Sequence, residues 1–250
     1  MIGARGWERD MVGESGGAVF RLRDADGDDL YLKFGTGAVA EAIADEAVRL
    51  RWLATRLPCP ETRAFVAQRG AAWLLTTALP GKTGDAWLEH DPAMLPQIIT
   101  AFAAFLRRLH ALPVAECPFD SGRTLRLAAA RRNVATGLVD ADDFDDDHAG
   151  WSAAEMLAET ERLAEFAPQR VVTHGDFSLG NLLLTEDCQV TGVIDLDRLG
   201  TADPYQDIAI FWQNMADFGG AAQAQFLADM GIERVDAQRL AFHRCLDELF

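Results

Sequence analysis

A polar segment followed by a short apolar hairpin constrains the fold of this chain more than any other feature. The segment HGDFSLGN occupies residues 174–181 and contains Asp176 and Asn181, five positions apart. Two apolar runs separated by turn residues follow at 181–194, and Asp195 comes directly after them. Apolar runs of this length around a turn predict a β-hairpin. The sequence therefore predicts a polar loop and a hairpin that together present three polar side chains.

The order of these three side chains matches the requirements of phosphoryl transfer. A kinase must hold a substrate hydroxyl in line with the γ-phosphate and neutralise the charge on the phosphoryl oxygens. Asp176 is the predicted base for the hydroxyl, and Asn181 and Asp195 are the predicted magnesium ligands. An Asp–Asn pair at this spacing often occurs by chance, but the preceding His174-Gly175, the hairpin and the second aspartate make coincidence improbable. An acidic loop without a catalytic role is the alternative.

The first part of the chain has the periodicity of strands around one helix. Apolar and polar residues alternate in 18–23 and 30–34. A helical pattern covers 39–57 before two prolines end it, and two further strands follow the prolines. An Asp-Gly pair lies between the first two strands, as expected for a tight turn. The predicted strands are 18–23, 30–34, 62–67 and 72–77.

The pattern becomes mainly helical after the breaker Leu79-Pro80-Gly81. Residues 96–112, for example, carry apolar side chains at helical spacing. We expect an α+β fold in which residues 1–78 form a small mixed lobe with an antiparallel sheet. Residues 79–250 are expected to form a larger, mainly helical lobe.

Composition narrows the class of protein further. The chain has 250 residues and a formal net charge of −16, which disfavours a nucleic-acid partner and suits a polycationic ligand. The 4 cysteines lie far apart without zinc-site spacing, so reduced thiols are expected. There is no signal-like N-terminus and no apolar run long enough to span a membrane. We therefore expect a cytoplasmic protein, monomeric or dimeric, without a membrane partner.

The motifs resemble a known family. The protein-kinase signature has the same order of Asp, Asn and Asp, and the HGDxxxxN form resembles the aminoglycoside phosphotransferases and choline kinases. Further segments, spread from about Gly13 to Phe250, resemble the aminoglycoside 3'-phosphotransferases in particular. These segments are WLLTTALPGKT (73–83), FLRRLHALP (105–113), CPFDSGR (117–123), GLVDADDFDDD (137–147), VVTHGDFSLGNLL (171–183), RLGTADPYQDIAI (198–210) and LDELF (246–250).

This resemblance implies a bilobal protein-kinase-like fold and a specific reaction. An aminoglycoside 3'-phosphotransferase transfers the γ-phosphate of ATP, with Mg²⁺, to the 3'-hydroxyl of antibiotics of the kanamycin and neomycin type. The expected biological consequence is antibiotic resistance. The expected partner is a small polycationic aminoglycoside.

The resemblance also assigns the phosphate-binding residues. Lys33 would pair with the α- and β-phosphates, and Glu46 on the next helix would hold that lysine. Ser15, in the small-residue segment 13–17, would contact phosphate because small residues let backbone N–H groups approach its oxygens. The alternatives are a surface lysine whose stem covers apolar neighbours and a plain turn at 13–17.

The adenine ring is expected against the segment that joins the two lobes. By resemblance, the backbone carbonyl of Thr77 and the backbone N–H of Leu79 would hydrogen-bond its edge. Tyr31 would stack on its face. A tyrosine that only fills the core is the alternative for Tyr31.

Acidic residues are expected to bind the substrate amines. Residues 137–147 contain six aspartates, of which Asp147 is the predicted contact, although such runs are often only solvated loops. By resemblance, Glu248 and the terminal carboxylate of Phe250 also bind amines, with a frayed helix end as the alternative. Arg198 resembles a family arginine near the phosphate site, and a structural ion pair is its alternative.

One position departs from the family pattern. The family has Asp-x-Gly-Arg after the hairpin, whereas this chain has Asp195-Leu196-Asp197-Arg198. Glycine permits backbone angles that other residues resist, and Asp197 also adds a negative charge near the metal ligands. Asp197 in place of the glycine is expected to affect the catalytic efficiency of the enzyme more than the class of reaction.

Three other functions are consistent with parts of the sequence. A kinase of another cationic small molecule or amino sugar would use the same machinery. A nucleotide-binding pseudokinase is disfavoured because every predicted catalytic residue is retained. A protein kinase is disfavoured most, because no APE-like segment or long activation loop follows Asp195.

Overall fold

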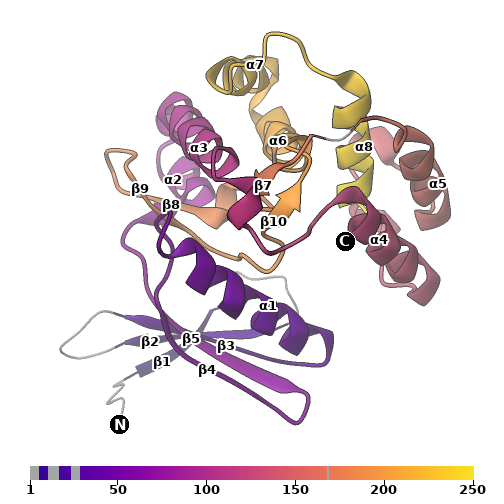
Figure 1. Ribbon diagram of the computed structural model, residues 1–250. Coiled ribbons are helices and arrows are strands. Elements are labelled where there is room, and N and C mark those ends of the chain that lie inside the picture. Colours follow the sequence, from indigo (N-terminus) through magenta and orange to yellow (C-terminus); the bar gives the residue numbers. More distant parts are fainter. Residues whose placement is uncertain (1–5, 11–16, 24–28, 168) are drawn as a thin grey trace. The chain divides into compact units, whose positions relative to one another are not determined.

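The computed structural model describes residues 6–10, 17–23, 29–167 and 169–250 (Figure 1). The chain divides into two compact units, Met1–Trp87 with Gly180–Arg198, and Leu88–Leu179 with Leu199–Phe250. The hairpin that follows the polar loop therefore packs with the first unit, although the residues before and after it belong to the second. The functional lobes 1–78 and 79–250 stay a prediction.

The first unit contains an antiparallel sheet in which the strand order is β1-β2-β3-β5-β4 (Figure 1). The β4–β5 turn consists of Arg69 and Gly70, both with positive φ, as two-residue hairpin loops of type I′ require. The strands predicted at 18–23, 30–34, 62–67 and 72–77 are present as β2, β3, β4 and β5, whereas the first strand, β1, was not predicted. Their bounds are β1 (Gly6–Asp10), β2 (Ala18–Arg23), β3 (Leu30–Thr36), β4 (Thr62–Gln68) and β5 (Ala71–Thr77).

Helix α1 (Ala38–Leu53) lies along one face of this sheet (Figure 1). Its apolar side chains recur at helical spacing, so one stripe of the helix is buried against the strands. The buried members of that stripe are Ala40, Ile43, Ala47, Leu50 and Leu53, together with the carboxylate residue Glu46.

The predicted hairpin after the polar loop is present. Strands β8 (Leu182–Leu184) and β9 (Val190–Val193) pair antiparallel, and β6 (Lys82–Thr83) joins them in the order β6-β8-β9. The indole N–H of Trp87 in α2 (Gly84–His90) donates to the carbonyl of Leu184 at 2.8 Å. These bonds fix the hairpin within the first unit.

The second unit is mainly helical, as predicted. A two-stranded pair of β7 (Val171–Thr173) and β10 (Gly200–Ala202) leads into the polar loop. The helices are α3 (Leu95–His110), α4 (Arg123–Thr136), α5 (Ala153–Leu163), α6 (Tyr205–Asn214), α7 (Gly220–Asp229) and α8 (Ala237–Asp247), with short 3-10 turns at Pro92–Met94, Val114–Glu116, Ala141–Asp143, Asp146–His148 and Met215–Phe218. A further 3-10 turn, Leu179–Asn181, forms the end of the polar loop, where the chain passes from the second unit to the first.

An aromatic cluster forms the core beneath the polar loop. Phe177 is fully buried directly after Asp176, and its ring lies 5.5 Å from that of Phe102 in α3. Phe211 of α6 stacks on Phe102 at 4.7 Å and contacts Phe226 of α7. Burial of a large apolar ring is strongly favourable, so Phe177 anchors the loop that carries Asp176.

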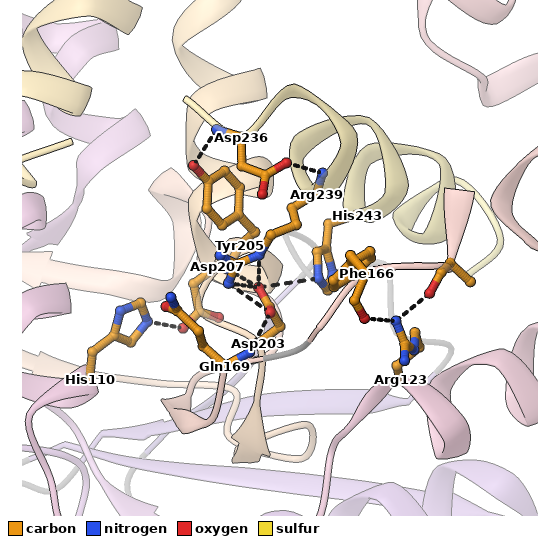
Figure 2. A network of polar contacts seen from close by, with 11 residues as sticks. His110, Arg123, Phe166, Gln169, Asp203, Tyr205, Asp207, Asp236, Arg239 and His243 are labelled. Atoms are coloured by element: carbon orange, nitrogen blue, oxygen red, sulfur yellow. Dashed lines mark hydrogen bonds and ion pairs between the residues drawn. The ribbon is translucent and has the colours of Figure 1, made fainter. Parts of the chain in front are cut away.

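A buried carboxylate joins the start of α6 to the start of α8 (Figure 2). Asp203 forms a bidentate ion pair with Arg239 at 2.6 and 2.7 Å. It also accepts hydrogen bonds from the backbone N–H groups of Tyr205 and Gln169. The Tyr205 hydroxyl in turn accepts from the N–H of Asp236, the N-cap of α8, at 2.8 Å.

Within the described part of the chain, no helix combines the length and the apolar character needed to cross a bilayer.

Replacing the buried carboxylate of Asp203 should strongly lower the stability of the protein. Asp203→Asn leaves the buried guanidinium of Arg239 without a full counter-charge, and breaking such a pair costs about 3 kcal/mol. Chemical denaturation followed by circular dichroism measures the free energy of unfolding. The control is Glu161→Gln, which removes an exposed partner of Arg131 and should change that free energy little. Equal effects of the two substitutions would contradict this expectation.

Candidate functional site

The first unit brings together the predicted lysine and two predicted carboxylates. Lys33, on β3, donates to both oxygens of Glu46 on α1, each at 2.8 Å. The same ammonium group hydrogen-bonds to Asp195, after β9. Burial alone would lower the pKa of Lys33, but Asp195 and Glu46 raise it above its usual value. Lys33 therefore stays charged and is held between two anions.

The two predicted metal ligands lie next to each other on the hairpin. The backbone N–H of Ile194 donates to the carbonyl of Asn181 at 3.0 Å, so Asn181 faces the residue before Asp195. An amide oxygen and a carboxylate are the hard oxygen ligands that Mg²⁺ takes, with waters and phosphates completing its coordination. Among the described residues, no group of three or more His, Cys, Asp or Glu side chains could hold a metal. The oxygen donors of Asn181 and Asp195 fit a magnesium ion whose other ligands are waters and phosphates.

The turn after the hairpin answers the question raised by Asp197. Of the described non-glycine residues, only Arg69, Cys188 and Asp195 have positive φ, and Asp195 has a φ of 58°. Aspartate tolerates this left-handed conformation better than most residues. Because the left-handed position is Asp195 and not Asp197, an aspartate at 197 causes no strain of this kind. Arg198 lies in the same turn.

The predicted adenine contacts share one end of the sheet. Tyr31 on β3 pairs with Thr76, and its neighbour Leu30 pairs with Thr77 at the end of β5. The N–H of Thr77 donates to the carbonyl of Glu61, and its hydroxyl accepts from the N–H of that residue. The chain then runs on towards Leu79. Ser15, the predicted phosphate contact, lies outside the described residues.

In the second unit, a buried aspartate holds the backbone of the polar loop. Asp207 on α6 accepts hydrogen bonds from the N–H groups of His174 and Gly175 at 2.9 and 2.8 Å. It also contacts His110 Nε2 at 2.9 Å (Figure 2). The N–H of Asp176 donates to His174 Nδ1 at 3.2 Å. Asp207 therefore fixes the two residues before the predicted base, which itself is half-buried.

Sequence reasoning missed Asp207 as a site residue. It lies inside the segment 198–210, whose resemblance to the family was noted, but nothing in its spacing reveals contact with residues 174 and 175. The pairing arises because α6 packs beside the loop.

Two of the predicted substrate carboxylates, Glu248 and Asp147, contact the end of α8 or the residues beside it. Glu248 accepts from the N–H of Asp145 at 3.1 and 3.3 Å and contacts His148 Nδ1 at 3.0 Å. Burial raises the pKa of the Glu248 carboxyl, and the His148 hydrogen bond opposes that rise. Arg244 forms ion pairs with Asp147 at 2.9 Å and with Asp145 at 3.4 Å. The acidic run is therefore an ordered part of the second unit.

The last residues of the chain are held by α4. Asn133 donates to the carbonyl of Leu249 at 2.9 Å, and the Arg126 guanidinium lies 3.8 Å from the centroid of the Phe250 ring. Leu249 is fully buried and Phe250 is 39% exposed. The terminus is thus packed, and the alternative of a frayed helix end is wrong.

Comparison with known proteins identifies the class. The profile of the phosphotransferase enzyme family, APH, matches residues 13–243, and the chain belongs to this family. It is 46% identical over 245 residues to an aminoglycoside 3'-phosphotransferase of Escherichia coli, which covers 98% of this chain and 90% of that protein.

Solved structures agree with this assignment. The crystal structure of an aminoglycoside-3'-phosphotransferase of type VIII matches with a TM-score of 0.89 at 36% identity, covering 98% of this chain and 94% of the other. An aminoglycoside phosphotransferase of Streptomyces rimosus, in complex with ADP and streptomycin, matches with a TM-score of 0.85 at 33% identity and coverages of 99% and 93%. The predicted α+β, protein-kinase-like fold is confirmed.

The structure predicts that Asp207 stabilises the polar loop. Asp207→Asn can accept at only one oxygen, so one loop N–H group and His110 lose their anionic partner, and hydrogen bonds to charged groups are the stronger ones. We expect faster amide hydrogen exchange in the peptide containing His174 and Gly175, measured by mass spectrometry. The exposed Asp217 supplies the control substitution Asp217→Asn. Unchanged exchange in the loop of the Asp207 variant would refute this role.

Proposed function

We propose that this protein transfers the γ-phosphate of ATP to the 3'-hydroxyl of aminoglycosides of the kanamycin and neomycin type and so confers resistance to them. The observation that carries the proposal is the nearly full-length similarity to aminoglycoside 3'-phosphotransferases, with every predicted catalytic residue retained. The proposed place of action is the cytoplasm, where ATP is available.

The nucleotide is held mainly by residues of the first unit. Lys33 leaves Asp195 to bind the α- and β-phosphates while Glu46 keeps its ammonium group in place. Asn181 and Asp195 would hold Mg²⁺, which would supply positive charge to the phosphates. Backbone groups of Thr77 and Leu79 are proposed to bind the adenine edge, and Tyr31 its face.

The reaction needs one base. Asp176 accepts a hydrogen bond from the 3'-hydroxyl and orients its oxygen towards the γ-phosphorus. The bond from this oxygen to phosphorus forms as the bond between phosphorus and the ADP oxygen breaks, and the hydroxyl proton passes to Asp176. Arg198 is proposed to lie near the transferred phosphoryl group. The products are the 3'-phosphorylated antibiotic and ADP.

The substrate is selected by charge. Aminoglycosides carry several ammonium groups, and the acidic run and the C-terminus provide carboxylates in one part of the second unit. Asp147, Glu248 and the terminal carboxylate of Phe250 are the proposed contacts. The net charge of −16 also attracts polycations from solution, an effect that salt weakens.

The reaction and its position on the sugar can be tested together. Release of ADP from MgATP is measured with kanamycin and with tobramycin, which lacks the 3'-hydroxyl. We expect turnover with kanamycin, none with tobramycin, and at least a ~100-fold lower kcat for Asp176→Ala, because the general base is lost.

Other outcomes would redirect the assignment. Turnover with tobramycin would exclude the 3'-hydroxyl as the sole acceptor. Turnover with streptomycin alone would favour the activity suggested by the streptomycin complex of the similar Streptomyces rimosus enzyme. A folded protein that binds ATP but phosphorylates no aminoglycoside would favour a kinase of another cationic small molecule.

Substrate binding should weaken in mildly acidic solution. The pKa of Glu248 is raised by burial, so its carboxylate is protonated at a higher pH than an ordinary glutamate and then no longer attracts an ammonium group. The KM for kanamycin should therefore rise as the pH falls, beginning at a higher pH than protonation of an ordinary glutamate would cause. Glu248→Gln should have a higher KM that varies less with pH over the same range. Identical pH profiles of the two proteins would contradict a role for this carboxylate.

A further inference from the structure

The residues 145–148, here called the acidic segment, end in a histidine that the proposed mechanism does not use. His148 closes the 3-10 turn Asp146–His148 and is buried, with a relative exposure of 9%. The neighbouring residues Asp146 and Asp147 are exposed. A buried polar side chain requires hydrogen-bond partners, and those of His148 lie on α8.

The contacts of His148 form a closed arrangement with Glu248. Its Nδ1 atom lies 3.0 Å from Glu248 Oε1. The same carboxylate accepts from the N–H of Asp145, while the N–H of His148 donates to the carbonyl of Asp145 at 2.8 Å. A carboxylate can only accept, so Nδ1 is the donor. Three hydrogen-bonding steps therefore join Asp145, His148 and Glu248 in a ring.

Packing fixes the orientation of the imidazole. Its ring meets the Trp151 ring edge to face, with centroids 5.1 Å apart. Its Nε2 atom lies 3.8 Å from Cys245 Sγ on α8. With neighbours on two sides, the ring has little freedom to rotate, so Nδ1 stays directed at Glu248.

The charges around this ring are mostly negative. Asp145 and Asp147 come from the acidic segment and Glu159 from α5, whereas Arg244 on α8 is positive. The Cys245 thiol adds no charge, because burial raises its pKa to about 11. Arg244 contacts the aspartates of the segment, and its guanidinium lies 5.7 Å from the centroid of the Trp212 ring on α6. Repulsion among the carboxylates would turn Glu248 away unless a donor held it. His148 is such a donor from the segment itself.

We propose that His148 is a positioning residue for aminoglycoside recognition, which holds the Glu248 carboxylate and the acidic segment in one arrangement. This inference rests on the function proposed above. Ammonium groups at fixed distances on a rigid sugar scaffold bind best to carboxylates that are already in place. His148 touches no reacting atom, so its loss should weaken binding of the antibiotic more than it slows the chemical step.

Two substitutions separate the hydrogen bond from the packing. His148→Phe keeps an aromatic ring against Trp151 but removes the donor. His148→Asn replaces the imidazole ring by a smaller amide group that keeps an N–H group near the position of Nδ1. His90→Phe, at an exposed histidine, is the matched control. Steady-state KM and kcat for kanamycin, KM for ATP and the melting temperature are measured for each protein.

We expect the KM for kanamycin to rise about 10-fold in His148→Phe, with kcat and the KM for ATP close to wild type. His148→Asn should recover much of this loss, and His90→Phe should match the wild type. In the double variant with Glu248→Gln, His148→Phe should add nothing further, because both changes remove the same interaction.

Failure has two distinguishable forms. If the wild-type protein phosphorylates kanamycin and His148→Phe has an unchanged KM, or raises both KM values with a lowered melting temperature, the positioning role is wrong and the proposed function stands. If the wild-type protein phosphorylates no aminoglycoside, the proposed function is wrong and this role falls with it.

Discussion

Two buried carboxylates four residues apart, at the start of α6, hold the functional elements of the second unit. Asp203 binds Arg239 and so fixes α8, which carries Glu248 and the chain end. Asp207 binds the N–H groups of His174 and Gly175 and so fixes the loop that carries Asp176. Burial of a charge is tolerated only when hydrogen bonds or an ion pair satisfy it. One helix start therefore positions both the proposed base and the proposed substrate carboxylates.

In the first unit, the residues proposed to bind the nucleotide are held together by one positive and two negative side chains. Lys33 lies between Glu46 and Asp195, so without a nucleotide its charge is already neutralised within the first unit. Under the proposed function, Asp195 would bind the divalent cation and Lys33 would bind the phosphates, so a bound nucleotide would replace the Lys33–Asp195 contact. The left-handed backbone at Asp195 directs the chain out of the hairpin at this point.

Local patterns in the sequence predicted four of the five strands of the sheet, β2 to β5, and the hairpin that follows the polar loop, but not β1. The spacing of Asp176, Asn181 and Asp195 and the resemblance to the family gave the candidate site residues. Contacts between distant segments could not be predicted in this way. His148 meets Glu248 across 100 positions, and Asp207 meets the polar loop across more than thirty. Likewise, the sequence left open whether Asp197 displaces the turn, because it could not show that the left-handed residue is Asp195.

The division of the chain into units has a consequence for its synthesis. Gly180–Arg198 packs with Met1–Trp87, yet the ribosome makes the intervening segment of the second unit first. At ordinary translation rates, synthesis of this intervening segment takes roughly 5 to 20 seconds. During that time the N-terminal sheet and α1 lack the hairpin that packs in the same unit. The second unit likewise lacks α6 and α8 until the end of translation. The nascent chain therefore exposes apolar surface that the finished units bury, and such surface favours aggregation until the missing segments have been made.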